Sequence, residues 1–312
     1  MKNPKNIFVL VFLFMCSLLQ AHANPVEKEC NMRLKDKVAL VTGAASGNGK
    51  AIASLFAKEG ARVVIADINA EGANALAKEL SGRGLEAVAV QADVTKEGDV
   101  RKMFDATLSK YGRLDILVNN AGVFDELIPV GNVSDELWDR VIATNLTAPM
   151  RAIRMAVPIF ERQGGGVIVN TASIAGYTGA RGGGAAYVAS KHGLVGLTKN
   201  VAYNYKERNI RCNAVAPGRV ETNLRVNSEK LVGSKTAHDA TIGKWKEIED
   251  KIIAGHDTNL RKCVPAEIAA AVLFLASDEA SFVNGSILTV DGAWTCSVSY
   301  THLRAHETSQ DL

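Results

Sequence analysis

"VALVTGAASGNGKAIA", residues 38–53, contains the change of period that decides the fold. Its first four residues are apolar and predict a short buried strand, whereas the residues from Gly49 onward predict a helix. Gly43, Gly47 and Gly49 lie at the junction, where glycine allows a tight turn and a close approach to a pyrophosphate at the helix N terminus. The spacing is not the common G-x-G-x-x-G, and such turns also occur for packing alone. The stretch therefore indicates, without establishing, a nucleotide-binding strand-turn-helix unit.

The same alternation of strand and helix continues from Lys37 to Gly292. Seven short apolar runs predict buried strands: "KVALVTG", "ARVVIAD", "AVAVQAD", "LDILVNNAG", "GGVIVNTAS", "NIRCNAVAPG" and "SILTVDG". Helical patterns lie between them, at residues 50–59, 70–80, 97–111, 134–162, 187–208 and 265–277. Buried strands separated by helices predict an α/β fold, a Rossmann-like doubly wound seven-stranded parallel sheet in a single domain.

The chain of 312 residues has an ordinary globular composition, with 47% hydrophobic and 22% charged residues. Its formal net charge of +3 is close to neutral and no basic stripe with interleaved aromatics occurs, so we do not expect nucleic acid as a partner. The five cysteines show neither CxxC spacing nor a Cys/His pattern. We therefore expect no metal site and no disulfide framework.

The two ends of the chain differ from the middle. Residues 1–23 combine two early lysines, a charge-free apolar run from Ile7 to Leu19 and an A-x-A site, which is typical of a secretory signal peptide. The apolar run is too short to span a membrane. If the segment is genuine the protein is exported, to the periplasm or outside the cell, and if translation starts at Met32 it is cytoplasmic. Residues 297–312 follow a finished domain at 32–296 and have no periodicity, so we treat them as a tail of doubtful origin.

A long polar and helical insertion, residues 221–262, follows the sixth predicted strand. In an open α/β sheet, ligands bind outside the carboxyl ends of the strands. We therefore expect this insertion to form a lid over a small-molecule substrate. Phe124 and Tyr177 are expected to help shape the pocket.

Two acidic residues end predicted strands near the glycine turn. Asp67 closes "VVIAD", where its carboxylate is placed to accept hydrogen bonds from the adenosine ribose and to repel a 2'-phosphate. The alternative is an N-cap for the following helix, which Asp67 or Asn69 could provide. Asp93 closes "AVAVQAD" and is expected to face the adenine by the same geometry. The pattern therefore favours NAD as the cofactor.

In "AAYVASKHG", residues 185–193, Tyr187 and Lys191 are four apart in a helical pattern and so lie on the same face. An ammonium beside a phenol favours the phenolate, so we expect the pKa of Tyr187 to lie below its ordinary value of roughly 10. Such a pair makes an acid/base catalyst. Ordinary packing of an amphipathic helix is the alternative, and the pair alone does not decide between them.

The wider set of motifs resembles the short-chain dehydrogenases/reductases. The shared features, in order, are Thr42 to Gly49, Asp93, Asn119 to Gly122, Asn145, Ser173 in "NTASIAG", Tyr187 with Lys191, and "APGRVETN" from Ala216. The resemblance covers residues 32–294, nearly the whole predicted domain. Because several independent motifs match together, it is highly specific.

The resemblance implies a catalytic tetrad. Tyr187 would be the general acid/base, Lys191 would lower its pKa and hold the nicotinamide ribose, Ser173 would polarise the substrate oxygen, and Asn145 would support a water relay to the lysine. It also implies that the cofactor is held by Gly43, Ser46, Gly47, Gly49, Asp67, Asp93, Val94, Asn120, Ala121, Gly122, Tyr187, Lys191, Pro217, Gly218, Val220 and Thr222. A homotetramer built on the helices at 134–162 and 187–208 is implied in the same way.

Three positions depart from the family pattern. Asn48 replaces the usual apolar residue inside the glycine turn, which puts the local packing in question. The interval between Ser173 and Tyr187 is slightly long because it contains a run of three glycines. Ala293 stands where a second glycine is common, and we expect this change to be tolerated.

These observations predict an oxidoreductase that transfers a hydride between NAD(H) and a secondary alcohol or ketone. An alternative substrate class is that of a 3-oxoacyl-carrier-protein reductase working with NADPH, which Asp67 disfavours. Another alternative is a catalytically idle dinucleotide-binding protein or scaffold, but such a protein would need neither Ser173 nor Tyr187. The sequence does not name the substrate.

Overall fold

The computed structural model describes residues 32–179, 183–232 and 261–296. The expected signal segment at 1–23, the tail at 297–312 and most of the expected lid lie outside the described residues. Among the helices within these ranges, none is both long and apolar enough to cross a membrane.

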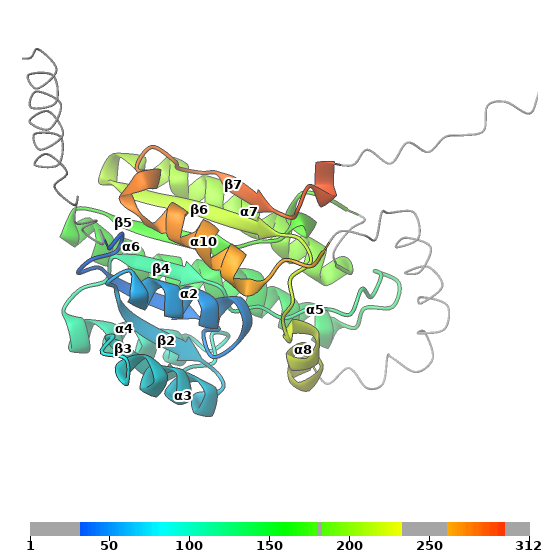
Figure 1. Cartoon of the computed structure of the whole chain (residues 1–312). Helices are drawn as coiled ribbons and strands as arrows, with labels where there is room; N and C mark the ends of the chain where they lie inside the picture. The colour runs from blue at the N-terminus through cyan, green and yellow to red at the C-terminus, as the bar shows by residue number, and fades with distance from the viewer. Residues whose placement is uncertain (1–31, 180–182, 233–260, 297–312) are drawn as a thin grey trace, which may run out of the picture. The chain divides into compact units, whose positions relative to one another are not determined.

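Within the described ranges, seven strands form one parallel sheet in the order β3-β2-β1-β4-β5-β6-β7 (Figure 1). They are β1 (Val38–Thr42), β2 (Arg62–Asp67), β3 (Ala87–Gln91), β4 (Ile116–Asn119), β5 (Gly166–Thr171), β6 (Ile210–Pro217) and β7 (Ile287–Val290). The predicted doubly wound sheet is confirmed. The strand order reverses between β1 and β4, so a crevice for a ligand opens at the carboxyl ends of these two strands.

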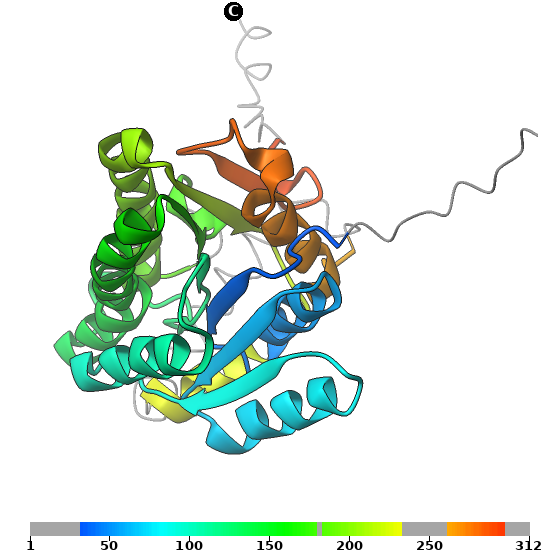
Figure 2. The same cartoon turned by 90° about the vertical axis from the view of Figure 1, so that its left-hand side faces the viewer.

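Helices cover both faces of the sheet (Figure 2). They are α2 (Gly47–Lys58), α3 (Ala70–Ser81), α4 (Glu97–Tyr111), α5 (Asp135–Ile142), α6 (Ala148–Gln163), α7 (Ala185–Tyr205), α8 (Leu224–Val232) and α10 (Pro265–Ala276). Buried residues of α2, α3 and α10 pack on one face, and those of α4, α6 and α7 pack on the other. Two apolar cores therefore enclose the sheet.

The sequence of the central strand β1 does not alternate between apolar and polar residues, and its burial explains why. All five of its residues are buried. Ala39 and Val41 belong to the core under α2 and α10, whereas Leu40 belongs to the opposite core under α4 and α6. Because both faces of the strand are covered, Val38 to Val41 form a continuous hydrophobic run, and only Thr42, at the carboxyl end, is polar.

The prediction of one continuous helix over residues 134–162 is wrong in the middle of that range. A π turn, η1 (Ala143–Thr147), separates α5 from α6, and the N–H of Ala148 donates to the carbonyl of Ala143, five residues back. The cause lies in Pro149, which has no N–H to donate to the carbonyl of Asn145, its partner in a regular α-helix. The wider turn places Asn145 at the point of the irregularity, as is common for π turns at functional sites.

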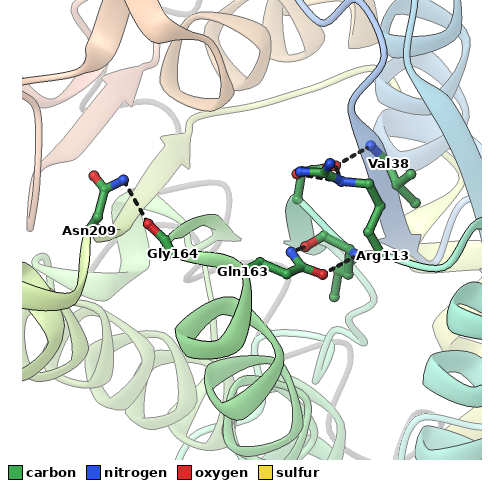
Figure 3. A network of polar contacts seen from close by, with 7 residues as sticks. Val38, Arg113, Gln163, Gly164 and Asn209 are labelled. Atoms are coloured by element: carbon green, nitrogen blue, oxygen red, sulfur yellow. Dashed lines mark hydrogen bonds and ion pairs between the residues drawn. The ribbon is translucent and has the colours of Figure 1, made fainter.

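Polar side chains bind together the opposite, amino edge of the sheet (Figure 3). The carboxylate of Asp115 accepts from the N–H of Val38 at 2.8 Å and from the guanidinium of Arg113 at 2.6 Å. The amide of Gln163 accepts from the N–H of Leu114 and donates to its carbonyl. These bonds join the starts of β1 and β4 to the end of α6, far along the strands from the crevice.

Candidate active site

The glycine turn between β1 and α2 is built so that no larger residue fits. A Cβ at Gly49 would lie 2.1 Å from the carbonyl oxygen of Gly43, and a Cβ at Gly43 would lie 2.8 Å from Cα of Ala121. Gly47 has space around it but adopts φ +52°, which favours glycine. Ser46 is the exposed N-cap of α2. The first N–H groups of α2 therefore face the crevice beside a backbone that a phosphate can approach closely.

The turn is tied to the Asn119–Gly122 segment after β4. The hydroxyl of Thr42 accepts from the N–H groups of Asn120 and Ala121 at 3.0 and 3.1 Å. The amide of Asn120 donates back to the carbonyls of Thr42 and Gly43 at 3.0 and 3.1 Å. These four bonds hold the two loops of the crevice at a set separation, which explains a Thr at the end of β1.

The two predicted acidic residues both lie beside the crevice. The carboxylate of Asp67 accepts from the N–H of Ala45 in the glycine turn at 2.9 Å and from that of Asn69 at 2.8 Å. Asn69, not Asp67, caps α3, because its side chain accepts from the N–H of Gly72. Each oxygen of Asp67 retains a second lone pair for ribose hydroxyls. Of the two open interpretations, the N-cap role thus falls to Asn69.

Asp93 forms a tight turn after β3. Its carboxylate accepts from the N–H and the hydroxyl of Thr95, at 3.0 and 2.7 Å. Burial is the largest single influence and would raise the pKa of Asp93, but the two bonds from Thr95 and the positive charges of Arg140 and Lys96 together lower the pKa below its ordinary value. The neighbouring Val94 packs against the core under α4. Asp93 is therefore ionised and holds the loop that follows β3.

The residues present fit a dinucleotide. A backbone cradle that excludes any Cβ, a helix N terminus facing it, and a carboxylate at the end of β2 are the three features that pyrophosphate and adenosine ribose require. Asp93, Val94 and the Asn120–Gly122 loop line the same edge of the sheet. These residues are the ones that could hold an NAD(P) molecule.

Tyr187 and Lys191 lie together on α7, as predicted. Both side chains are buried, at 7% and 4% exposure. The ammonium of Lys191 donates to the carbonyl of Thr171 at 2.8 Å and lies 5.5 Å from the centroid of the Tyr187 ring. The hydroxyl of Ser173 lies close enough to the phenol of Tyr187 to lower the pKa of that phenol. Three of the four expected catalytic side chains therefore meet at the end of β5.

The expected lowering of the pKa of Tyr187 is wrong for this arrangement. Burial raises the pKa of Tyr187 to about 12, against a smaller lowering by Ser173, and the negative charge of Asp125 raises it further. Burial also lowers the pKa of Lys191 to about 8. The sequence shows that the two groups are near each other, but not that both are removed from water, and the desolvation of each charge dominates.

Asn145 contacts the group through the loop after β4. Its side-chain oxygen accepts from the N–H of Val123 at 2.9 Å, and its amide donates to the carbonyl of Val123 at 2.9 Å and to the hydroxyl of Ser190 at 3.1 Å. A Cβ built on Gly122 would lie 3.3 Å from this oxygen and 3.8 Å from Nζ of Lys191. Asn145 and Lys191 therefore flank Gly122, and the side chain of Asn145 holds the loop.

The segment after β6 closes the other side of the crevice. Pro217 ends β6, and a Cβ on Gly218 would lie 2.8 Å from Cβ of Asp291, so glycine is required there. Val220 forms a bridge with Cys263, and Thr222 lies beside Gly47. These contacts bring the predicted cofactor residues of this segment up to the glycine turn.

The two aromatic residues expected in the pocket lie differently. Phe124 is buried and packs edge-on against the ring of Tyr187, with centroids 5.0 Å apart. The N–H of Phe124 donates to the hydroxyl of Ser228 on α8 at 2.8 Å. Tyr177 is 42% exposed, and its hydroxyl bonds to that of Thr289 on β7 at 3.0 Å. Phe124 thus connects the catalytic candidate to α8, the described part of the expected lid.

Two of the three departures have structural consequences. Asn48 has a buried side-chain oxygen that finds no hydrogen-bond partner within the described ranges, so the local conflict expected there is present. Ala293 adopts φ +68°, so the change expected to be harmless places a Cβ in the left-handed region. The glycine there would relieve this strain.

Sequence reasoning missed Asp125, a buried carboxylate that accepts from the N–H groups of Gly184 and Tyr187 at 2.8 Å each. A single acidic residue in a loop carries no motif. The available signal was indirect: the N-cap of α7 is Gly184, which has no side chain to cap the helix.

Comparisons with known proteins agree with this geometry. A family model described as Enoyl-(Acyl carrier protein) reductase matches residues 43–295. The chain is 42% identical to a 3beta-hydroxysteroid dehydrogenase 2 of Eggerthella lenta over 277 residues, covering 88% of this chain and 98% of that one. It is 38% identical to a 3-oxoacyl-acyl-carrier-protein reductase of Thermotoga maritima, with coverage of 84% and 98%. The crystal structure of levodione reductase superposes with a TM-score of 0.74 at 34% identity, covering 85% of this chain and all of that one (100%).

Proposed function

We propose that this chain, which belongs to the short-chain dehydrogenase/reductase family of oxidoreductases, transfers a hydride between NAD(H) and a secondary alcohol or its ketone, with Tyr187 as general acid/base. The observation that carries the proposal is the buried meeting of Tyr187, Ser173 and Lys191 beside the glycine turn. A protein that only binds a dinucleotide gains nothing from a buried phenol beside a serine and a buried lysine.

In the oxidation, the proton of the alcohol passes to the phenolate of Tyr187 while the C–H bond of the same carbon breaks and the C=O bond forms. An NAD held at the glycine turn and by Asp67 would supply the acceptor for that hydride, at C4 of its nicotinamide. The hydroxyl of Ser173 orients the substrate oxygen toward the phenol. In the reduction, the phenol returns its proton to the developing alkoxide. Because burial raises the pKa of Tyr187 to about 12, we expect oxidation to accelerate as the pH rises above neutrality.

The charge of Lys191 supports the same step. Its ammonium lies on the ring of Tyr187 and is held by the carbonyl of Thr171, so it stabilises the phenolate when it is protonated. We also propose, from the family resemblance, that Lys191 holds the ribose of the nicotinamide. Since burial lowers the pKa of Lys191 to about 8, part of this stabilisation is lost in alkaline solution. The oxidation rate is therefore expected to level off at high pH.

Cofactor choice is proposed from the end of β2. The carboxylate of Asp67 lies beside the glycine turn, where a 2'-phosphate would meet a like charge. The neighbouring Ile68 is 40% exposed and offers no positive charge. NAD is therefore proposed over NADP. An NADPH-dependent 3-oxoacyl-carrier-protein reductase remains the second candidate, because a relative carries that name.

The substrate is proposed to be an alcohol, sugar or steroid-like compound with a secondary hydroxyl. Two proteins similar to this chain are named for a hydroxysteroid and for levodione. Purified protein should be assayed with NAD(H) and NADP(H) against a panel of open-chain alcohols, sugars, cyclic alcohols, hydroxysteroids and 3-oxoacyl thioesters. Turnover of the thioesters alone, with NADPH, would favour the second candidate.

Tyr187→Phe tests the catalytic role directly. It removes the transferable proton but little binding surface, so turnover should vanish while the affinity for NAD stays within a few-fold. Lys191→Ala should lower both turnover and the affinity for NAD, because the same ammonium is proposed to act on the phenol of Tyr187 and on the ribose of the cofactor. Retained turnover in Tyr187→Phe above a tenth of wild type would leave the protein as a dinucleotide binder without this chemistry.

Two further features complete the proposal. The family resemblance suggests a homotetramer through α6 and α7, which sedimentation measurements would check. Residues 1–23 suggest export, which the N-terminal sequence of the natural product would check.

A further inference from the structure

Asp125 lies in the loop between β4 and α5 and belongs to none of the proposed catalytic or cofactor-binding groups. Its side chain is completely buried, at 0% exposure. One oxygen accepts from the N–H of Gly184 and the other from the N–H of Tyr187, both at 2.8 Å. Buried carboxylates require such donors, because an unpaired buried charge is strongly unfavourable. Both oxygens of Asp125 are therefore committed to the start of α7.

These two bonds replace a missing N-cap. A helix normally begins with a side chain that accepts from the N–H of its second or third residue. α7 begins at Ala185 with Gly184 as its N-cap, and Tyr187 is its third residue. A Cβ at Gly184 would lie 2.4 Å from the backbone of Ile128, so a capping side chain has no room there. Asp125 supplies the cap from a loop 62 residues earlier in the chain.

The loop that carries Asp125 is held in a strained shape against α7. Glu126 and Leu127 both have positive φ, at 56° and 63°. The carbonyl of Ile128 accepts from the N–H of Ala185 at 2.9 Å, and the ring of Phe124 packs edge-on against that of Tyr187. Consecutive left-handed residues without glycine are costly and occur where the surroundings enforce them. The loop and the first turn of α7 therefore form one unit.

We propose that Asp125 is a positioning residue for Tyr187: its two oxygens fix the first turn of α7, and they place a negative charge beside the backbone of Tyr187. The proposal rests on the proposed function of Tyr187 as general acid/base. The carboxylate of Asp125 would then both position the phenol of Tyr187 and contribute part of the rise in its pKa.

The charges around the phenol are consistent with this role. Burial is the largest cause of the raised pKa of Tyr187, and Asp125 acts in the same direction. The ammonium of Lys191 lies 5.5 Å from the centroid of the Tyr187 ring, and Arg225 of α8 lies over the ring of Phe124 at 5.2 Å. Glu126 lies in the same loop as Asp125, and α5 contributes the apolar Leu137 and Val141 to this cluster. Burial raises the pKa of Asp125, while its bonds from the N–H groups of Tyr187 and Gly184 oppose that rise.

Asp125→Asn and Asp125→Glu separate the two parts of the proposal. Asp125→Asn keeps the size but removes the charge and one of the two acceptors, so the acid limb of the pH profile for alcohol oxidation should move down by roughly 0.5–1 pH unit. Asp125→Glu keeps the charge but displaces it, so kcat should fall roughly ten- to a hundredfold, with KM for NAD within about twofold and the acid limb in place. Asp115→Asn is the matched control, because it alters a buried, backbone-bound carboxylate at the far edge of the sheet and should change neither kcat nor the pH profile.

Hydrogen exchange gives a readout that needs no turnover. The peptide containing residues 184–190 should exchange faster in both Asp125 variants than in wild type, and at the wild-type rate in Asp115→Asn. If wild type shows no dehydrogenase activity, the proposed function fails while this exchange measurement still decides whether Asp125 holds α7. Coinciding pH profiles of Asp125→Asn and wild type would overturn the electrostatic part. If Asp125→Asn does not fold, an unchanged kcat or a lowered acid limb in Asp125→Glu overturns the proposal.

Discussion

Gly49→Ala should damage cofactor binding more than any other single methyl group added to the glycine turn. The new Cβ would lie 2.1 Å from the carbonyl oxygen of Gly43 and 2.6 Å from the amide nitrogen of Asn120. The amide can rotate away, but the carbonyl belongs to the backbone of the turn. Relief therefore requires the N terminus of α2 to move away from β1.

The size of the effect follows from that distance. Reaching an ordinary contact, from 2.1 to 3.4 Å, takes a displacement of about 1.3 Å. Overpacking of this kind costs roughly 1–3 kcal/mol in the free energy of unfolding, which corresponds to a Tm lower by about 2–12 °C. The same movement draws the first N–H groups of α2 from a bound phosphate, and losing one charge-assisted bond costs about 1.5–3 kcal/mol, or roughly 10- to 150-fold in Kd.

The assay is a fluorescence titration with NADH beside a thermal melt. Gly98→Ala is the control, since a Cβ there meets nothing within 4 Å and alanine is the better helix former. Gly47→Ala should fall between the two, because its Cβ clears Thr222 at 3.4 Å and only the strain of φ +52° remains, at about 1–2 kcal/mol. Affinity for NADH within twofold of wild type in Gly49→Ala would refute the assignment of this turn to the pyrophosphate.

Three further predictions follow from single side chains. Repulsion between Asp67 and a 2'-phosphate costs on the order of a few kcal/mol, so kcat/KM should favour NAD by roughly a hundredfold and Asp67→Ser with Ile68→Arg should shift the preference toward NADP. Equal kcat/KM for the two cofactors in wild type would contradict the placement of Asp67. The pKa of Lys191 is 10.5 in the unfolded chain but about 8 in the folded protein, so keeping it charged and buried destabilises the fold at pH 7. Lys191→Met should therefore raise the free energy of unfolding at pH 7. Urea titrations should show this increase shrinking between pH 8 and 10.5. An increase in stability that grows with pH in Lys191→Met would contradict this prediction. Ala293→Gly should raise the free energy of unfolding by about 1 kcal/mol, since it relieves φ +68°, and a lower Tm would contradict this.

The strands could be predicted because burial on both faces of the sheet requires short uninterrupted runs of apolar residues, and most helices could be predicted from the helical patterns between these runs. The first four residues of β1 are all apolar, and the same holds for the central part of β2. The π turn could not be read from periodicity, which continues through it. The signal was Pro149, four residues after Asn145, whose missing N–H breaks one helical bond.

The residues of the candidate site likewise fall into those that the sequence reveals and those that it does not. Motif residues such as Gly49 and Tyr187 are visible in the sequence because their chemistry requires one residue type. Asp125 was not visible, because its partners are backbone N–H groups that any residue at those positions offers. The direction of the pKa of Tyr187 also depended on desolvation, which is a property of the assembled structure.

The central position of β1 has a consequence for synthesis on the ribosome. β2 ends at Asp67, but β4, which pairs with the other edge of β1, begins only at Ile116, 49 residues later (116 minus 67). Translation at about 5–20 residues per second leaves that apolar edge without its strand for roughly 2–10 s. An open edge of this kind pairs readily with neighbouring nascent chains. A ribosomal pause between codons 67 and 116 should therefore promote aggregation on polysomes, whereas a pause after β5 should not.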